Sequence, residues 1–427
     1  MKRFLILLCA VFGFSLISEA QELTPESVER RLDRSDRQIE HDRRSQRPRT
    51  WVNRGIVFQD IFDVNIQLLY LGMSKEELIL FMDEPEERQT IETERGVVRD
   101  VLVYENIDVY FQDGQLVGWN ERVVIHESPL EEAYEAFQTA IELDERGRQE
   151  RRLQEAFLRL HGQFISQAVK QYEDSEFKKA FESFQYAVKV ADSPLYEEPI
   201  DTGIVFNTGF LAAVAGEHEE ALKYLKRARD MDYSDANLYV LIKETYVELG
   251  DSTSAERILQ EGFEKFPQEN ALLIELVNFY IHADNAEAAL DYLELAKQQE
   301  PDNPSFHFAE GALFERLGKG DKAKEAYKRS IELDPDFFDV NYNMGVIYYN
   351  EAVRMLEEAN EIVDNVEYEE ARKEAFDVLR KSIPYMEQAH VVDPDHRETM
   401  ETLRILYYRL GMEDKLEEMN KKLGREE

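Results

Sequence analysis

The chain has 427 residues, 43% of them hydrophobic and 11% aromatic, which is enough apolar material for about two to three packed domains. Asp and Glu outnumber Lys and Arg by 89 to 51, giving a formal net charge of −38. A protein that binds nucleic acid, or anionic lipid through a broad surface, needs clustered Lys and Arg to displace counterions from phosphates. The composition therefore excludes nucleic acid as a partner, and it excludes lipid binding through a broad basic face.

Residues 1–20 have the three-part pattern of a secretory signal peptide. A basic start precedes an apolar run over residues 4–17, and small residues precede Gln21. This apolar run is shorter than the roughly 20 residues of a membrane-spanning helix. The only cysteine, Cys9, lies inside the leader, so the mature chain would have neither thiol chemistry nor a disulfide. The pattern predicts an exported protein without a transmembrane segment.

Internal repeats determine the expected architecture. Segments that start at residues 202, 236, 270, 304 and 338 are spaced by 34 residues and repeat the same residue types. Position 8 is glycine, position 20 alanine and position 32 proline in most of them: Gly209, Gly311, Gly345; Ala221, Ala255, Ala289, Ala323; Pro267, Pro301, Pro335. Two amphipathic helices joined by a tight turn explain this spacing, because the small residues let the helices approach closely. We expect the large residues at position 24 to fill the space between neighbouring pairs. The pattern resembles the tetratricopeptide repeat family.

The resemblance predicts a mainly α protein, a tetratricopeptide-repeat α-solenoid over residues 161–424. Its units are 161–194, 202–235, 236–269, 270–303, 304–337, 338–396 and 397–424. The unit at 338–396 carries an insertion without Gly or Pro, which predicts that both of its helices are lengthened. The last unit has a charged end and serves as the cap of the solenoid.

The first repeat is predicted to be split between residues 48–61 and 129–144, where Gly55 and Phe137 take repeat positions. The inserted residues 62–128 do not show the repeat pattern. Ser74 and Glu77 form a capping box for a helix that Pro85 ends, and three strand-like runs follow at 97–105, 107–113 and 115–121. Asp-Gly at 113–114 predicts a tight hairpin. We therefore expect a small α/β module, a helix followed by an antiparallel β-meander.

This inserted module resembles the BamE (SmpA/OmlA) domain over residues 71–121, in its helix-to-proline turn and its V-Y-F-Q-D-G-Q-L-V hairpin. The resemblance implies a small periplasmic module linked to outer-membrane protein assembly. The whole chain resembles exported tetratricopeptide repeat proteins of Gram-negative bacteria, which implies the periplasm, the outer membrane or secretion as its location.

Residues 21–47 form a polar segment rich in arginine ahead of the repeats. Nine arginines stand against four acids between residues 30 and 54. Two hypotheses remain open: a solvated helical or disordered leader with local ion pairs, or a basic arm that docks to the acidic solenoid or to anionic lipid.

No catalytic or metal-binding constellation is present in the sequence. The eight histidines are scattered singly, and neither HExxH nor a glycine-rich phosphate loop occurs. We expect no enzyme activity, no metal and no cofactor.

A binding groove is the leading functional hypothesis. In the family that the repeats resemble, the first helices of successive repeats line a concave face. Carried onto this sequence, the groove residues are Phe206, Phe210, Asn237, Val240, Glu244, Val247, Ile274, Asn278, Ile281, Phe308, Tyr342, Val346 and Tyr349. Asn237 and Asn278 are candidates for hydrogen bonds to a peptide backbone. The alternative is that the apolar members pack within the chain, against the lengthened helices, or in a homo-oligomer.

The sequence predicts a protein–protein interaction scaffold of the bacterial cell envelope, with a protein as its partner. Two alternatives stay open: an accessory factor in envelope protein assembly that acts through the BamE-like module, and a regulator or inhibitor of an exported enzyme.

Overall fold

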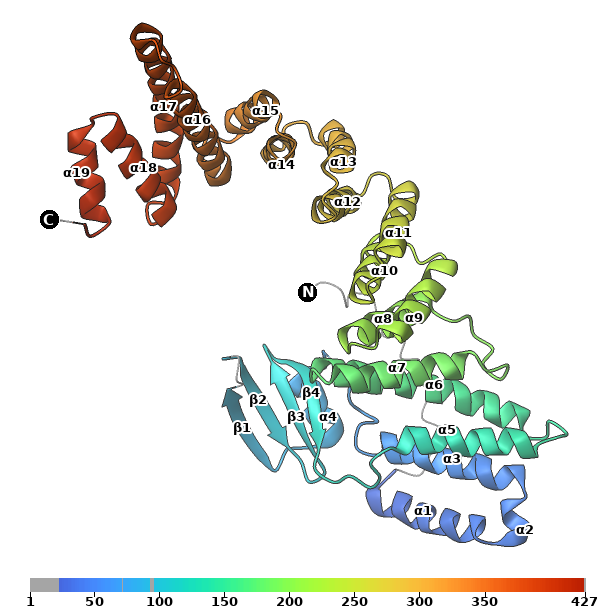
Figure 1. Cartoon of the computed structure of the whole chain (residues 1–427). Coiled ribbons are helices and arrows are strands. Elements are labelled where there is room, and N and C mark those ends of the chain that lie inside the picture. The colour runs from blue at the N-terminus through green and yellow to red at the C-terminus, as the bar shows by residue number, and fades with distance from the viewer. Residues whose placement is uncertain (1–22, 71, 93–95, 426–427) are drawn as a thin grey trace. The chain divides into compact units, whose positions relative to one another are not determined.

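The computed structural model describes residues 23–70, 72–92 and 96–425 (Figure 1). The expected signal peptide, residues 1–20, lies outside them. The chain divides into two compact units, residues 1–233 and 234–427. Over the described ranges, no helix combines the length and apolar character needed to cross a bilayer.

Most helices of the first unit share one hydrophobic core. Two helices that are distant in sequence pack directly against each other within it. The helices of this unit are α1 (Pro25–Ile39), α2 (Asp42–Ser45), α3 (Pro48–Asp63), α5 (Pro129–Leu143), α6 (Glu150–Glu173), α7 (Phe177–Ala191), α8 (Thr202–Val214) and α9 (His218–Asp230). Phe58, Phe137, Phe157 and Phe164 are fully buried among α3, α5 and α6. Gly55 allows α3 to lie directly on the Phe137 ring of α5, because a Cβ added there would be 2.6 Å from two ring carbons. Helices α3 and α5 thus pack as the pair that a split first repeat requires.

The arginine-rich segment contains an ordered helix, α1, that packs on α3. Val28 of α1 is fully buried in the core of the first unit. The buried carboxylate of Asp60 on α3 pairs with Arg31 at 2.5 Å and with Arg159 of α6 at 2.7 Å. Of the two hypotheses for this segment, the structure shows docking onto acidic side chains of the same chain.

The inserted module is a four-stranded antiparallel sheet with one helix, α4 (Lys75–Met82), on one face. The strands are β1 (Glu87–Glu92), β2 (Val98–Val103), β3 (Ile107–Gln112) and β4 (Gln115–Glu121), in that order across the sheet. Leu78 of α4 packs with Phe111 and Trp119 in a core of its own. The side chain of Ser74 caps α4 as expected, although the Glu77 carboxylate accepts a hydrogen bond from the Tyr70 hydroxyl.

The expectation of three strands is wrong, because β1 forms a fourth. All six residues of β1 are exposed, and its polar sequence ERQTIE has no alternation of apolar residues that would have marked it as a strand. Pairing with β2 alone holds β1 in the sheet, with Glu87 opposite Val103 and Glu92 opposite Val98.

The second unit continues the helical pairs. Its helices are α10 (Asn237–Glu248), α11 (Ser252–Lys265), α12 (Asn270–His282), α13 (Ala286–Gln299), α14 (Pro304–Arg316), α15 (Gly320–Leu333), α16 (Phe338–Ala359), α17 (Asn365–Val392), α18 (Arg397–Arg409) and α19 (Glu413–Lys422). Helices α16 and α17 have 22 and 28 residues, whereas α10, α12 and α14 have 12 or 13. The insertion at 338–396 therefore lengthens both helices of its pair.

Where position 8 is glycine, it explains the close packing within the pair. A Cβ on Gly209 would lie 2.7 Å from Leu225, and one on Gly345 would lie 2.7 Å from Met386. The position-24 side chain therefore sits on the glycine of its own pair. This corrects the expectation that position 24 fills the space between neighbouring pairs.

Candidate protein-interaction surface

The predicted groove residues of the first unit lie on α8 and are largely covered. Phe206 is only 4% exposed, and its ring stacks on Tyr233 with centroids 4.5 Å apart. Its assignment to an open groove is therefore corrected, since the turn after α9 covers the ring. Phe210 is half-buried.

The predicted groove residues on α14 and α16 are engaged inside the second unit. Phe308 packs on the rings of Tyr327 and Phe337, with centroids 5.8 and 5.2 Å away. Tyr342 stacks on Phe338 and meets His396 edge-on at 5.4 Å. Two further predicted residues pack beside Tyr342 in the C-terminal core: Val346 and Tyr349. For these positions the structure supports packing within the chain rather than an open groove.

The first helices α10 and α12 present the exposed part of the predicted groove. Val247 is 48% exposed and Ile274 is 41% exposed, although both are apolar. Glu244 and Asn278 are exposed beside them in sequence. Three further predicted residues of these helices are half-buried: Asn237, Val240 and Ile281. We call Glu244, Val247, Ile274 and Asn278 the α10–α12 surface.

A half-buried ion pair links α10 and α12. The Lys243 ammonium lies 2.8 Å from the Glu275 carboxylate, and only 14% of the lysine side chain is exposed. Lys243 occupies repeat position 8, where three other units have glycine, and its long side chain reaches the next first helix. This pair holds the backbone beneath the α10–α12 surface in a defined register.

Tyr280 also links α12 to α11 through hydrogen bonds. The Tyr280 hydroxyl donates to the Glu256 carboxylate at 2.6 Å and accepts from the Gln260 amide at 3.0 Å. Burial raises the pKa of the Tyr280 hydroxyl, and the carboxylate of Glu256 raises it further, so the group stays protonated and keeps donating. The surface is thus carried by rigid helices, which lowers the ordering cost of binding.

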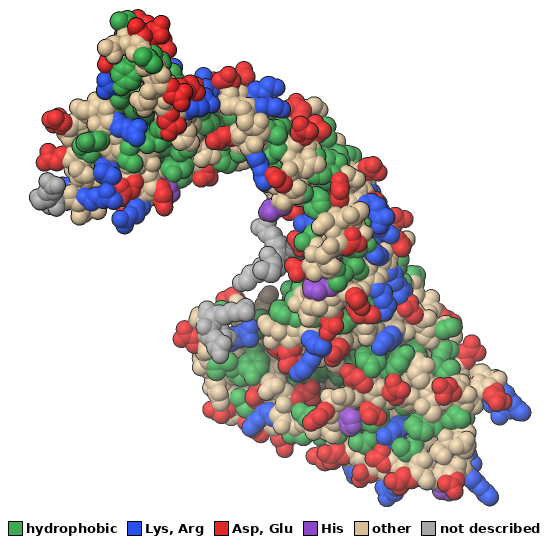
Figure 2. Space-filling view, in the orientation of Figure 1, with side chains coloured by type: hydrophobic (Ala, Val, Ile, Leu, Met, Phe, Trp, Pro, Cys, Tyr) green, Lys and Arg blue, Asp and Glu red, His purple; other side chains and the backbone are tan. Residues whose placement is uncertain are grey.

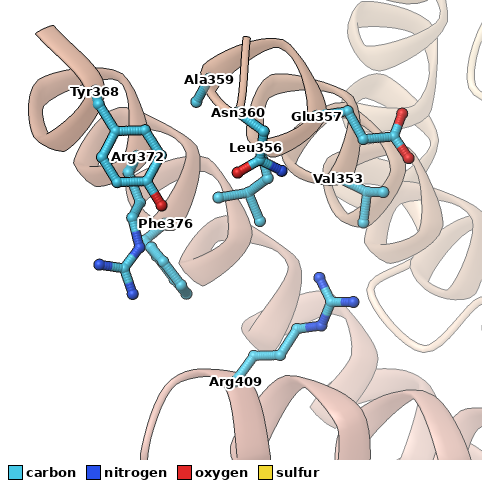
Figure 3. Close-up of a pocket in the computed structure, with 9 residues that line it drawn as sticks. All are labelled: Val353, Leu356, Glu357, Ala359, Asn360, Tyr368, Arg372, Phe376 and Arg409. Atoms are coloured by element: carbon cyan, nitrogen blue, oxygen red, sulfur yellow. The ribbon is translucent and has the colours of Figure 1, made fainter. Parts of the chain in front are cut away.

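Sequence analysis missed a pocket between the lengthened helices and the last repeat (Figure 3). Its volume is about 330 Å³, and its lining comes from α16, α17 and α18: Val353, Leu356, Glu357, Ala359, Asn360, Tyr368, Arg372, Phe376 and Arg409. Figure 3 shows Arg409 reaching from α18 toward Val353 and Leu356, while Arg372 and Phe376 form another wall. The pocket therefore joins an apolar floor to two guanidinium groups.

The two arginines of this pocket, Arg372 and Arg409, form few ion pairs with acidic side chains. Arg409 lies over the ring of Tyr349 at 5.8 Å, and among the described residues it has no ion pair. Arg372 lies over Phe376 at 5.4 Å and meets Glu369 only at 3.6 Å. The sequence signal for this site was weak, since its three segments are separated by up to 56 positions, from Val353 to Arg409.

The described part of the chain holds no group of three or more His, Cys, Asp and Glu side chains suited to a metal ion. The chemistry that the exposed sites support is recognition: apolar contact, hydrogen bonding by amides, and charge pairing.

Comparisons with known proteins identify the repeats. Models described as tetratricopeptide repeats match residues 213–272 and 244–304, and one described as TPR repeat matches residues 316–351. With the fold above, they define a mainly helical tetratricopeptide-repeat solenoid with a small four-stranded antiparallel insertion near the N-terminus.

Curated relatives share only part of the chain. Mouse protein O-mannosyl-transferase TMTC3 is 27% identical over 157 residues, which cover 33% of this chain and 17% of the mouse protein. Human protein O-mannosyl-transferase TMTC1 is 24% identical over 211 residues, covering 45% of this chain and 23% of the human protein. This chain thus spans less than a quarter of the length of each relative. Mannosyl transfer belongs to the names of those two proteins and is not transferred to this chain.

Solved structures with a similar fold include YrrB, described as a TPR protein with an unusual peptide-binding site. It is 16% identical with a TM-score of 0.33, over 42% of this chain and 88% of YrrB. MamA from Desulfovibrio magneticus RS-1 is 15% identical with a TM-score of 0.35, over 46% of this chain and 97% of MamA.

Proposed function

We propose that this protein is a non-catalytic scaffold that binds a partner protein at the α10–α12 surface. The observation that carries the proposal is the exposure of Val247 and Ile274, because the apolar groove residues predicted on α8, α14 and α16 are buried or half-buried. Covering these two side chains would remove apolar area from water, worth about 25 cal/mol for each Å².

The chemistry of the surface defines the kind of partner. The Asn278 amide offers both a donor and an acceptor to the backbone of an extended or helical segment. Exposed Glu244 and Glu248 make the neighbourhood acidic. A segment with an aliphatic side chain flanked by Lys or Arg would satisfy both features.

The scaffold is further proposed to be exported to the periplasm of the cell envelope. This rests on the leader pattern of residues 1–20. Expression in a Gram-negative host followed by osmotic-shock fractionation tests it. Recovery in the shock fluid of a mature chain that begins at Gln21 is the expected result, and retention of the whole leader in the cytoplasm would refute export.

A second candidate function uses the inserted module, whose similarity to BamE suggests a role in envelope protein assembly or in the regulation of an exported enzyme. The favouring observation is that Leu80 and Phe81 on α4 are 79% and 50% exposed on the side of the helix away from its core. Exposed large apolar side chains on a small module are typical of an interaction site.

One experiment separates these functions. Purified protein is used to capture partners from an envelope fraction, beside Val247→Asp/Ile274→Asp, Leu80→Asp/Phe81→Asp and a control, Val391→Asp, whose parent side chain is also exposed. Loss of a discrete partner only in the first variant supports the scaffold. Loss only in the second variant supports the module, and equal capture by all four proteins refutes both sites.

A further inference from the structure

The joined ends of α16 and α17 carry apolar side chains into solvent. Figure 1 shows these ends projecting away from α18 and α19. Val363 in the connection is 96% exposed, and Val366 in the first turn of α17 is 69% exposed. In Figure 2 this projection, at the upper left, shows green apolar atoms among red acidic ones. We call residues 361–367 the hairpin tip.

Charge is divided along the same hairpin. Residues 357–371 contain seven acids and no Lys or Arg, whereas residues 372–381 contain four bases and two acids. The tip is therefore acidic, and the part of α17 nearer the repeats is basic. Such a gradient favours an antiparallel neighbour of the same sequence, because each acidic end then meets a basic one.

The pocket between α16, α17 and α18 lies where the acidic and basic parts of this hairpin meet, since Glu357, Asn360 and Tyr368 line it beside Arg372 and Phe376. Its floor of Val353, Leu356 and Phe376 suits aliphatic side chains, and Arg372 and Arg409 at its walls suit carboxylates (Figure 3). At about 330 Å³ it is near the lower limit of ligand pockets, about 300 Å³. That volume is small for a cofactor and appropriate for one or two side chains.

We propose that the hairpin tip of a second copy of this chain occupies this pocket. Val363 and Val366 enter over the apolar floor, while the exposed Glu361 and Glu367 face Arg409 and Arg372. The chain carries the tip and most of the pocket lining on one hairpin, and α18 adds Arg409. A two-fold axis with antiparallel hairpins therefore places each tip in the other pocket and closes the assembly as a dimer.

This interface goes beyond the proposed scaffold and explains several features together. A hairpin tip with aliphatic side chains in water is unfavourable unless a partner covers it. Arg409, which has no ion pair among the described residues, gains a carboxylate. The 25 additional residues of the insertion then serve to build both the pocket and its occupant, since the ordinary repeat needs neither.

Sedimentation equilibrium of the purified protein over a concentration series tests the proposal. The unmodified chain should dimerise, and the dissociation constant should rise by at least about tenfold in Val363→Asp/Val366→Asp, a loss of about 1.4 kcal/mol or more. The control Val391→Asp changes an exposed valine outside the tip and pocket and should leave dimerisation unchanged.

Charge reversal makes the test specific to tip and pocket. Glu361→Lys/Glu367→Lys and Arg372→Glu/Arg409→Glu should each weaken the dimer, and the chain with all four changes should recover it. Asp364 is left unchanged because its side chain caps α17. Circular dichroism confirms that each variant keeps its helices. A monomer at every concentration, a dimer indifferent to the tip valines, or the absence of recovery in the fourfold variant would overturn the proposal.

Discussion

Substituting Gly55 by alanine tests the packing between α3 and α5, the two helices that the sequence predicts to be halves of a split first repeat. A Cβ at residue 55 would lie 2.6 Å from Cδ1 and Cζ of Phe137, far inside the roughly 3.5–4.0 Å of an ordinary carbon–carbon contact. The Phe137 ring is fully buried and packs against Phe157 at a centroid distance of 6.0 Å. The ring has little room to retreat, so α3 and α5 must separate.

The expected magnitude combines two opposing effects. Overpacking of a core usually costs about 1–3 kcal/mol, and three close ring atoms place this site toward the upper end. Alanine in place of glycine inside a helix contributes about 1 kcal/mol in the other direction. We therefore expect Gly55→Ala to lower the free energy of unfolding of the first unit by about 1–2 kcal/mol.

Gly162 provides the matched control, because it lies inside α6 of the same unit and an added Cβ would meet nothing within 4 Å. Gly162→Ala should raise stability by about 0.5–1 kcal/mol. Urea denaturation followed by circular dichroism measures both variants. The double variant Gly55→Ala/Phe137→Leu should recover part of the loss, because leucine removes the ring. Equal stabilisation by both alanines would refute the close approach of α3 and α5.

Three further predictions concern single residues. Asp83 has φ 60° and ψ −169°, a backbone region essentially reserved for glycine. Asp83→Gly should therefore stabilise the module by about 1 kcal/mol, whereas Asp83→Ala should not. Thermal unfolding measures both variants. Asp60→Asn should cost about 1–3 kcal/mol, because it leaves Arg159 with a weakened partner, and a neutral result would contradict this. Burial lowers the pKa of His161 below its usual value near 6.5. As the pH falls through 6.5, the unfolded chain therefore binds a proton at His161 that the folded chain does not bind. Stability of the first unit should therefore decline from pH 7 to 5 more steeply than in His161→Gln, and identical slopes would refute this.

The helical repeats were predictable from sequence because their physics is local. Close approach of two helices requires a small residue at position 8, and the turn between them requires a residue that tolerates positive φ. Gly216, Gly250 and Gly318 have φ between 69° and 79°. Such requirements recur every 34 residues and are visible without any knowledge of the fold.

The exposed surfaces were harder to predict because they depend on what covers a residue. Phe206 has the right repeat position for a groove, yet Tyr233 from outside the first helix lies on it. The pocket beside Arg409 depends on how far α16 and α17 extend, which no periodic pattern states. Strand β1 exposes every side chain, so only its partner strand reveals it.

Departures from the repeat rule coincide with the surfaces that we assign to binding. Position 8 is Lys243 in α10 and Val277 in α12, and these two helices carry the exposed apolar pair. The insertion at 338–396 interrupts the period and creates both the pocket and the hairpin tip. Where a sequence gives up a locally favourable residue without a gain in packing, function is the usual reason. In our proposals, the regular units keep the helices together and the irregular ones supply the contacts with other molecules.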